Sequence, residues 1–433
     1  MNLGRGKNVK LENGLNKLYT ATLATLAIGL LIGCNGGDTP SNGNGNSTDP
    51  AANLKEPAVK IGLVASQNGE LVPWGKDCID GAQLAVDAAN RAGGIDGYKI
   101  QLVVEDSASA PEQGKTATEK LIQGGVVGIL GEVSSGITQP MTQVTSEINM
   151  PHIAVGATKT TITEIGPNVF RVCYTDDFQG PVMAKFAYEA LGLKKVAIMT
   201  DEKQPYSQYL SKTFKDYYVK LGGEIVSEES YESKQTNFTA QLTRVKARNP
   251  QGIFLSGYFT EVGPIVKQAG TLGLSNVKYF GGDGWDSDEL ISSGGDAIVG
   301  GYFCNHYNDK EDRQEVKSFL DAWAKKYDGG KPGTTMGALG YDAAALMIDA
   351  IKRAGSTEKQ PIIDALENTV DFPGVSGNIS LKGMGGNPMK QALVVEVEKT
   401  GFKAVKSYSF EDIYAPGDPI YTPVDRSAKK ASS

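Results

Sequence analysis

The chain has 433 residues, a formal net charge of −7 and a hydrophobic content of 40%. The negative charge, without any Lys/Arg-rich run carrying interleaved aromatic residues, argues against nucleic-acid binding. About 370 residues lie between a polar N-terminal stretch and a polar tail (426–433), which is too many for one ordinary hydrophobic core and predicts two lobes.

The first 33 residues are organised like a secretory signal. Four Lys/Arg residues precede an apolar run at 21–33, which ends in Leu31-Ile32-Gly33-Cys34. This run is too short to span a bilayer, which takes about 20 residues. It resembles the lipobox of bacterial lipoproteins, which implies a signal peptide at 1–33, acylation of Cys34 and anchoring outside the cytoplasmic membrane, at the cell surface or in the periplasm. Residues 34–56 are polar and aperiodic and are expected to form a disordered tether.

The rest of the chain alternates between strand and helix patterns. In the first series we expect strands at 59–65, 98–104 and 126–130, with helices from about 76 and from 111. In the second series we expect strands at 195–200, 224–230, 252–256 and 277–280, separated by helices at 206–221, 239–248 and 262–272. Later elements are expected at 315–327, 341–354 and 392–397. Two βαβ series predict an α/β fold with two doubly wound, mostly parallel-sheet lobes joined by a hinge.

The sequence offers little for catalysis, a metal or a cofactor. Its two histidines, His152 and His306, stand in unrelated contexts, and a structural role is expected for each. After Cys34 only three cysteines remain, an odd set that reads as core thiols. No HExxH, CxxC or GxSxG motif occurs, and the phosphate-loop and dinucleotide patterns are incomplete. We therefore expect neither an enzyme nor a cofactor-binding protein.

Loops that follow the predicted strands carry the candidate binding residues, because doubly wound sheets bind ligands beyond the carboxyl ends of their strands. Ser134 and Ser135 stand at the start of a helix, where hydroxyl and N–H groups can hold a carboxylate. An ordinary N-cap by Ser135 is the alternative. Further loops offer hydroxyl, aromatic or carboxylate groups at Trp74, Gly156-Ala157-Thr158, Tyr206, Tyr258, Asp283 and Trp285.

A set of short segments runs in a fixed order along the chain from about residue 59 to 421. The segments are Gly75…Gly81-Ala82, Asn90-Arg-Ala-Gly-Gly-Ile95, Ser134-Ser-Gly-Ile-Thr-Gln-Pro140, Gly156-Ala-Thr158, Gln179-Gly-Pro181, Tyr206, Gly257-Tyr258, Gly282-Asp283-Gly284 and Gly340-Tyr341-Asp-Ala-Ala344. No single segment is specific, but the ordered set resembles the branched-chain amino-acid (Leu/Ile/Val) binding proteins of ABC importers, which have a type I periplasmic-binding fold.

The resemblance implies a role for each candidate residue. Ser135 and Thr158, with backbone groups at Gly156 and Ala157, would bind the ligand's α-carboxylate. Asp283 would pair with the α-ammonium, although the family often has the longer Glu there. The remaining candidates would line the pocket and close over the ligand: Trp74, Tyr206, Tyr258 and Tyr341. Trp285 would narrow the side-chain pocket if it turns inward and would be a surface residue if it turns outward.

The implied function is capture of a neutral aliphatic amino acid (Leu, Ile, Val or Ala) by hinge closure and its delivery to ABC permease subunits. A sensor of the same fold, which presents an amino acid or a small carboxylate to a receptor partner, is the alternative. The family pattern divides the chain into lobe 1 (57–175 and 307–370) and lobe 2 (176–306 and 371–425). It also puts Cys173 and Cys304 on neighbouring crossing segments, where they would be close enough to pair.

Overall fold

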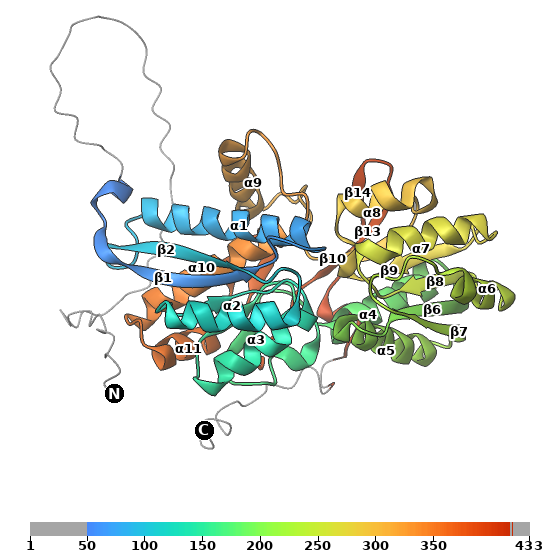
Figure 1. Cartoon of the computed structure of the whole chain (residues 1–433), viewed down its shortest axis with the longest axis horizontal. Coiled ribbons are helices and arrows are strands. Elements are labelled where there is room, and N and C mark those ends of the chain that lie inside the picture. Colours follow the sequence, from blue (N-terminus) through green and yellow to red (C-terminus); the bar gives the residue numbers. More distant parts are fainter. Residues whose placement is uncertain (1–49, 416–417, 419–433) are drawn as a thin grey trace, which may run out of the picture.

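The computed structural model describes residues 50–415 and 418, which form two α/β lobes side by side (Figure 1). Within these residues, the first lobe contains a parallel sheet of five strands in the order β2-β1-β3-β4-β5. Its strands are β1 (Lys55–Ala65), β2 (Tyr98–Asp106), β3 (Ile129–Leu130), β4 (His152–Ala154) and β5 (Val169–Arg171). The inner strands are buried on both faces, which explains their continuous apolar runs.

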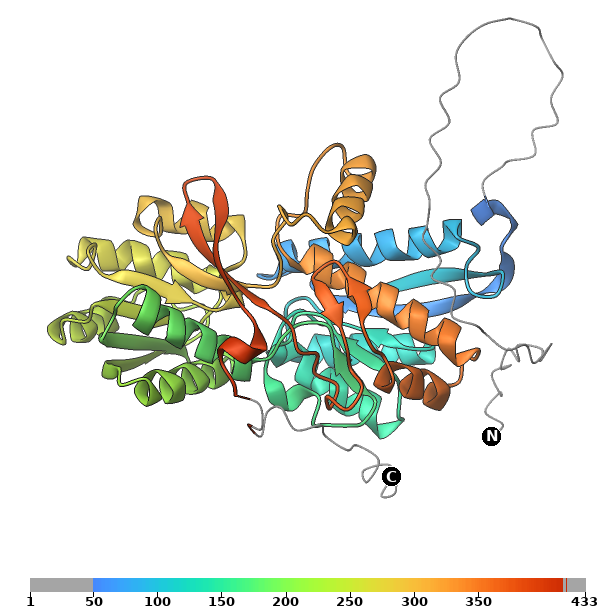
Figure 2. The same cartoon turned by 180° about the vertical axis from the view of Figure 1, so that it is seen from behind.

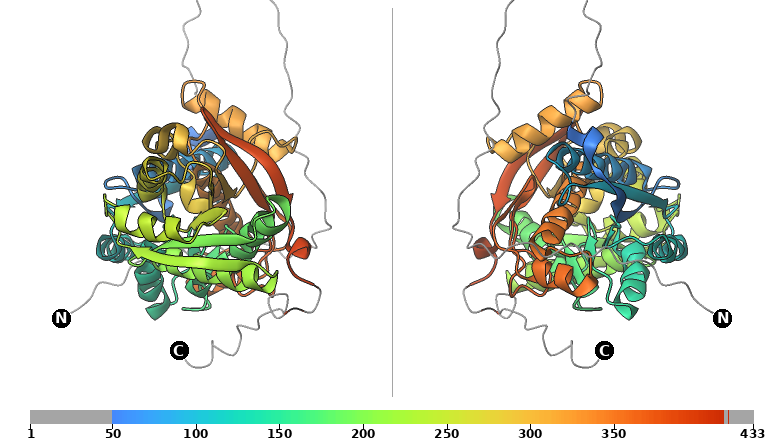
Figure 3. Two further views of the ribbon diagram at one scale, coloured as in Figure 1. Left: turned by 90° about the vertical axis from the view of Figure 1, so that its right-hand side faces the viewer. Right: turned by 90° about the vertical axis from the view of Figure 1, so that its left-hand side faces the viewer.

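The second lobe contains a sheet of seven described strands in the order β14-β13-β10-β9-β8-β6-β7. Its parallel part is β6 (Lys195–Asp201), β7 (Glu224–Tyr231), β8 (Gly252–Leu255), β9 (Lys278–Gly281) and β10 (Tyr302–Asn305). The hairpin of β13 (Ala392–Glu398) and β14 (Gly401–Tyr408) joins β10 in antiparallel fashion and forms one edge of the sheet (Figure 3).

Helices cover both faces of each sheet. In the first lobe they are α1 (Val72–Arg91), α2 (Pro111–Gln123), α3 (Ser135–Glu147), α9 (Gln314–Lys326), α10 (Met336–Ala354) and α11 (Lys359–Glu367). In the second lobe they are α4 (Asp176–Lys185), α5 (Pro205–Lys220), α6 (Thr239–Ala247), α7 (Phe259–Thr271) and α8 (Asp288–Gly294). None of these helices is long and apolar enough to cross a membrane.

Glycines allow α1 and α10 to pack backbone against backbone. A Cβ at Gly81 would lie 1.9 Å from the carbonyl oxygen of Gly337, and one at Gly340 would lie 2.3 Å from that of Cys78. Any larger side chain at these positions would force the two helices apart. This contact fixes α10, which comes late in the sequence, onto the first lobe. It thereby also sets the position of the N-terminus of α10.

The chain passes between the lobes three times, after β5, after β10 and before β13 (Figure 2). Before the third passage it forms a hairpin of β11 (Phe372–Gly374) and β12 (Gly377–Ile379). The N–H groups of Val375 and Ser376, in its turn, donate to the buried Asp342 of α10. The lobe boundaries taken from the family pattern assign residues 371–425 to the second lobe, whereas this hairpin contacts α10 of the first lobe.

Two expected segments differ from the structure or lie outside it. The tether was expected to reach residue 56, but Pro50–Asn53 forms a 3-10 turn, and the N–H of Lys55 donates to the carbonyl of Gly97 at the start of β1. The ordered sheet therefore begins earlier than composition indicated. The predicted signal peptide 1–33, Cys34 and the tail 426–433 lie outside the described residues.

Candidate ligand-binding site between the lobes

A very small cavity, with a volume of about 10 Å³, lies between the two lobes at the carboxyl ends of their strands. It is lined from the first lobe by Trp74, Val133, Ser135, Gly156 and Met336, and from the second by Tyr206, Tyr258, Asp283 and Gly284. Six of the nine residues predicted to bind ligand are therefore brought together: Trp74, Ser135, Gly156, Tyr206, Tyr258 and Asp283. Loops that are far apart in the sequence meet here because parallel strands all end at one edge of each sheet.

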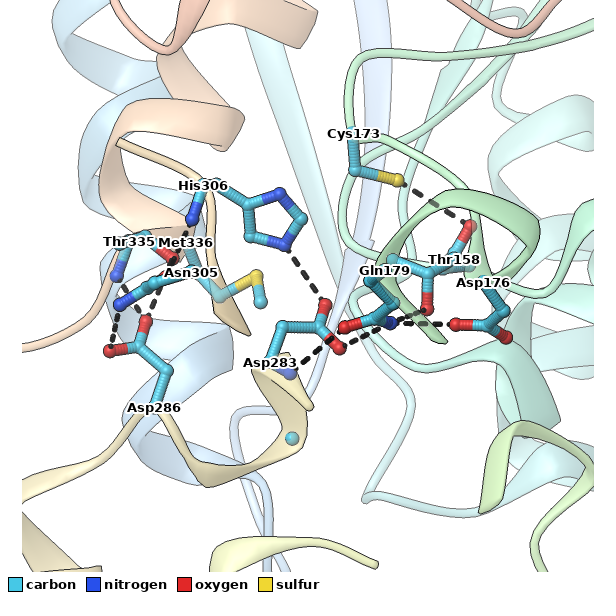
Figure 4. Close-up of polar contacts among 12 residues, drawn as sticks. Thr158, Cys173, Asp176, Gln179, Asp283, Asp286, Asn305, His306, Thr335 and Met336 are labelled. Carbon is cyan, nitrogen blue, oxygen red and sulfur yellow. Dashed lines mark hydrogen bonds and ion pairs between the residues drawn. The ribbon is translucent and has the colours of Figure 1, made fainter. Parts of the chain in front are cut away.

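Asp283 presents a buried carboxylate with donors on both oxygens (Figure 4). Its Oδ1 accepts from Tyr206 Oη at 2.8 Å and from Gln179 Nε2 at 2.9 Å. His306 Nε2 lies 2.9 Å from Oδ2. Gln179 also holds the backbone, since its Oε1 accepts from the Asp283 N–H at 3.1 Å. These contacts hold the Asp283 carboxyl group in place at the second-lobe wall of the cavity.

A second carboxylate, Asp176, stands behind the first. It is the first residue of α4, and Gln179 Nε2 donates to its Oδ1 at 2.7 Å while also reaching Asp283. Its Oδ2 is buried and has no hydrogen-bond partner among the described residues. Burial, together with the nearby Asp283, raises the pKa of Asp176 to about 8. Asp176 therefore mostly keeps its proton at neutral pH.

The opposite wall offers hydroxyl and backbone groups. Ser135 is the first residue of α3, and its Oγ accepts from the Lys159 N–H at 3.2 Å. The alternative of Ser135 as an N-cap is wrong, because Ser134 occupies the N-cap and its own N–H donates to the carboxylate of Glu132. The Ser135 hydroxyl therefore remains beside the cavity.

The loop that holds Gly156, Ala157 and Thr158 is supported from below by the buried Arg171. This guanidinium donates to the carbonyls of Ala157 at 2.6 Å, Lys159 at 2.9 Å and Thr160 at 3.0 Å. Ala157 and Thr158 do not line the cavity itself. The Thr158 hydroxyl lies just beside it, where it accepts from Gln179 Nε2 at 3.3 Å.

Aromatic side chains close the cavity. The rings of Tyr206 and Tyr258 stack with centroids 5.1 Å apart, and Trp74 meets Tyr258 edge to face at 5.2 Å. Trp74 also joins the lobes, because its Nε1 donates to the Asp286 carbonyl of the second lobe at 2.6 Å. The lobes are thus in direct contact over the cavity.

Two predicted aromatic roles need correction. Tyr341 does not line the cavity, since it lies one and a half turns into α10 and packs edge to face against Phe319 at 5.4 Å. Met336, at the start of the same helix, reaches the cavity instead. Trp285 turns neither into the pocket nor to the surface. It is fully buried in the second lobe, where its Nε1 donates to the Leu255 carbonyl.

The expected proximity of Cys173 and Cys304 does not produce a disulfide. Both are free, buried thiols, as is Cys78. Cys173 Sγ instead lies 3.5 Å from the Ala157 carbonyl as a donor. All three cysteines therefore behave as core residues, the role that composition favoured.

Gln179 and His306 were missed as site residues by sequence reasoning. Gln179 stood within a family segment without an assigned role, and His306 was expected to be structural. An acid followed by an amide three residues later at a helix start (Asp176 and Gln179) was the available signal for the first. For His306 the only signal was its place directly after a strand.

Comparison with known proteins agrees with this architecture. A family model described as "Periplasmic binding protein" matches residues 58–402. A "Leu/Ile/Val-binding protein homolog 1" of Brucella abortus is 30% identical over 345 residues, which cover 79% of this chain and 91% of the relative.

Two solved structures have the same fold. The leucine-binding protein LivK of Thermotoga maritima is 32% identical, with a TM-score of 0.77 over 82% of this chain and 100% of that one. The branched-chain amino acid transporter substrate-binding protein LivJ of Streptococcus pneumoniae, solved with isoleucine, is also 32% identical, with a TM-score of 0.76 over 81% and 99%. The chain belongs to the periplasmic binding protein family, a family of substrate-binding proteins and not of enzymes.

Proposed function

We propose that this protein is the lipid-anchored, extracytoplasmic substrate-binding protein of an ABC importer and that it captures a neutral aliphatic amino acid between its lobes. One observation carries the proposal. A carboxylate, Asp283, faces hydroxyl and backbone groups at Ser135 and Gly156 across one small cavity between the lobes. A zwitterionic amino acid carries an ammonium for the first of these groups and a carboxylate for the second.

The charges of such a ligand need partners, since an unpaired buried charge is very costly. The α-ammonium would donate to Asp283. The α-carboxylate would accept from the hydroxyls of Ser135 and Thr158 and from N–H groups at Gly156 and Ala157, near the positive end of the α3 dipole. The lining residues of this cavity include no Lys or Arg, which disfavours a second carboxylate on the ligand.

The rest of the lining suits an apolar side chain of modest size. The lining includes the apolar side chains of Val133 and Met336 and the rings of Trp74 and Tyr258. The named functions of the relatives support the same class, since they include Leu/Ile/Val-binding proteins and a protein solved with isoleucine. Leu, Ile, Val and Ala are therefore the expected ligands.

Hinge closure would couple binding to transport. The three passages between the lobes allow one lobe to rotate against the other, and a bound ligand stabilises the closed form by its differential affinity for it. The closed form would then dock on the ABC permease. Acylation at Cys34 would keep the protein at the membrane; labelled palmitate should mark the wild-type protein in cells and leave the Cys34→Ser variant unmarked.

The test is thermal unfolding of the mature chain with each of the twenty amino acids. A ligand that binds only the folded state adds about 2.7 kcal/mol of stability at a hundredfold excess over its dissociation constant. We expect a shift confined to Leu, Ile, Val and Ala that is lost in Asp283→Asn. Tyr341→Phe is the matched control and should keep the shift, because Tyr341 lies outside the cavity. A flat response to all twenty, in protein freed of carried-over ligand, would overturn the proposal.

A further inference from the structure

We infer that His306 positions Asp283 and competes with the ligand's ammonium for it, so that amino-acid capture requires a neutral His306 and is coupled to release of a proton. This inference rests on the proposed function. It assigns a binding role to a residue at the hinge that touches the cavity only through Asp283.

The geometry is that of a positioning residue. The His306 side chain is fully buried, and its Nε2 lies 2.9 Å from Asp283 Oδ2 (Figure 4). The ring stacks on Tyr174, with centroids 4.0 Å apart and planes 23° from parallel. Its Nδ1 is buried and has no hydrogen-bond partner among the described residues. The proton of a neutral imidazole therefore belongs on Nε2, where it donates to Asp283.

His306 also lies in one of the segments that connect the two lobes. It follows β10 directly, on the second passage between the lobes, and its N–H donates to Asn305 Oδ1 at 2.8 Å. Asp283 lies after β9 on the second lobe. The hydrogen bond therefore ties the carboxylate that faces the ligand to the hinge.

The surrounding charges decide what protonation of His306 would do. The titratable and charged groups near the pair are Asp283, Asp286 and Asp176, then Tyr174, Tyr206, Tyr307 and Cys304. A second cavity, which His306 lines, adds Glu311, Arg313 and Lys390. Asp283, in direct contact with the ring, would pair with an imidazolium at this position.

An imidazolium at His306 would neutralise Asp283 before a ligand arrives. The α-ammonium would then meet a compensated carboxylate and a like charge, and binding would have to expel the proton. Affinity should consequently fall once the pH is low enough to protonate His306. A residue that merely fills space would leave the pH profile unchanged.

The decisive experiment measures the dissociation constant of L-isoleucine, with L-valine and L-alanine in parallel, from pH 5 to 8 in the mature chain and in His306→Gln. Gln can place its Nε2 donor near the position of the imidazole Nε2 but takes up no proton. We expect wild-type affinity to weaken by up to about tenfold per pH unit at the acidic end and the His306→Gln affinity to vary less than about threefold. His306→Leu, which offers no donor, should bind more weakly than His306→Gln at pH 8.

A second readout does not depend on any variant folding. The chain has only two histidines, so imidazole NMR signals can be assigned in protein made without a histidine tag. Saturating isoleucine should suppress the pH response that the His306 signal shows in the free protein. His152 is the internal control: burial lowers its pKa to about 4, so its signal should stay constant from pH 5 to 8.

The outcomes separate the two proposals. Equal pH profiles in wild type and His306→Gln, or a His306 signal that ignores isoleucine, would overturn this inference and leave amino-acid binding intact. Failure of all twenty amino acids to bind at any pH would overturn the proposed function itself.

Discussion

Asp286→Asn should weaken ligand binding although Asp286 lies outside the cavity. Asp286 follows Trp285 in the second lobe, and its Oδ2 accepts from the N–H of Thr335 at 2.6 Å and from its hydroxyl at 2.7 Å. Thr335 precedes α10 on the first lobe. The carboxylate thus caps a helix of the opposite lobe, and we expect this contact to act as a latch that opens when the lobes separate.

The size of the effect follows from these contacts. Hydrogen bonds to a charged group contribute about 1.5–3 kcal/mol. Asn keeps one oxygen for the Thr335 N–H, but it loses the charge and turns its NH₂ toward the NH₂ of Asn305, which donates to Asp286 Oδ1 in the native protein. We expect the closed form to lose about 2 kcal/mol, which is about thirtyfold in the closing equilibrium. In a protein that is mostly open without ligand, the apparent dissociation constant rises by the same factor.

Asp77→Asn is the matched control. Asp77 Oδ2 accepts from the N–H of Thr334 at 2.6 Å and from its hydroxyl at 2.9 Å, the same arrangement within the first lobe. Calorimetric titration with isoleucine and urea unfolding should therefore separate the variants. Asp286→Asn should lose affinity with little loss of folding stability, and Asp77→Asn should do the reverse. An Asp286→Asn affinity within threefold of wild type, or an equal loss in both variants, would refute the latch.

Three further predictions concern stability and the binding loop. Burial raises the pKa of Asp176 to about 8, so the folded protein holds a proton that the unfolded chain loses near pH 4. The free energy of unfolding of the wild type therefore falls as the pH rises between these two values, by up to about 1.36 kcal/mol per pH unit. Asp176→Asn lacks this loss, and its advantage in urea unfolding should grow from pH 5 to 8; a constant difference would contradict the assignment. Gly81→Ala should lower the free energy of unfolding in urea by about 3 kcal/mol, because the added Cβ would overlap a backbone oxygen of α10. Gly270→Ala is the control and should hardly change this free energy, since the atoms nearest to its added Cβ lie at 3.9 Å. Equal losses in the two variants would count against the close helix contact. Arg171→Met should leave three buried carbonyls of loop 157–160 without this donor and weaken isoleucine binding more than tenfold by calorimetry, with unchanged affinity as the contrary result.

Local patterns were sufficient for most of the architecture. The alternating and apolar runs predicted β1, β2 and the strands β6 to β9, because period and burial are properties of neighbouring residues. The strand predicted at 126–130 is shorter in the structure, since only Ile129–Leu130 pairs on both sides. β14 was missed although Gly401–Tyr408 alternates, because its pattern is mostly polar and indicates a strand only once β13 is beside it.

Site residues could be predicted where they directly follow a strand. Their hydrogen-bond partners could not be predicted where these lie far away in the sequence. Asp283 could be placed from its loop, but the amide that holds it belongs to Gln179, 104 residues earlier. Tyr341 was placed in the pocket by the order of segments, and the helical phase of α10 overrules this by turning Met336 to the cavity. The fate of Trp285 depended on whether the second-lobe core had room for an indole and an acceptor for its N–H, which no local pattern reports.

Under the proposed function, the charges around the cavity would let one polar network select neutral amino acids. Asp283 is the one carboxylate among the cavity's lining residues, while Asp176 behind it holds a proton at neutral pH because burial raises its pKa. A single ammonium on the ligand therefore finds one carboxylate partner. A second ammonium on the ligand would find no further carboxylate among the cavity's lining residues, and a second carboxylate would find no Lys or Arg. With both charged classes excluded by desolvation, discrimination among the remaining amino acids falls to the volume left by Trp74, Val133 and Met336.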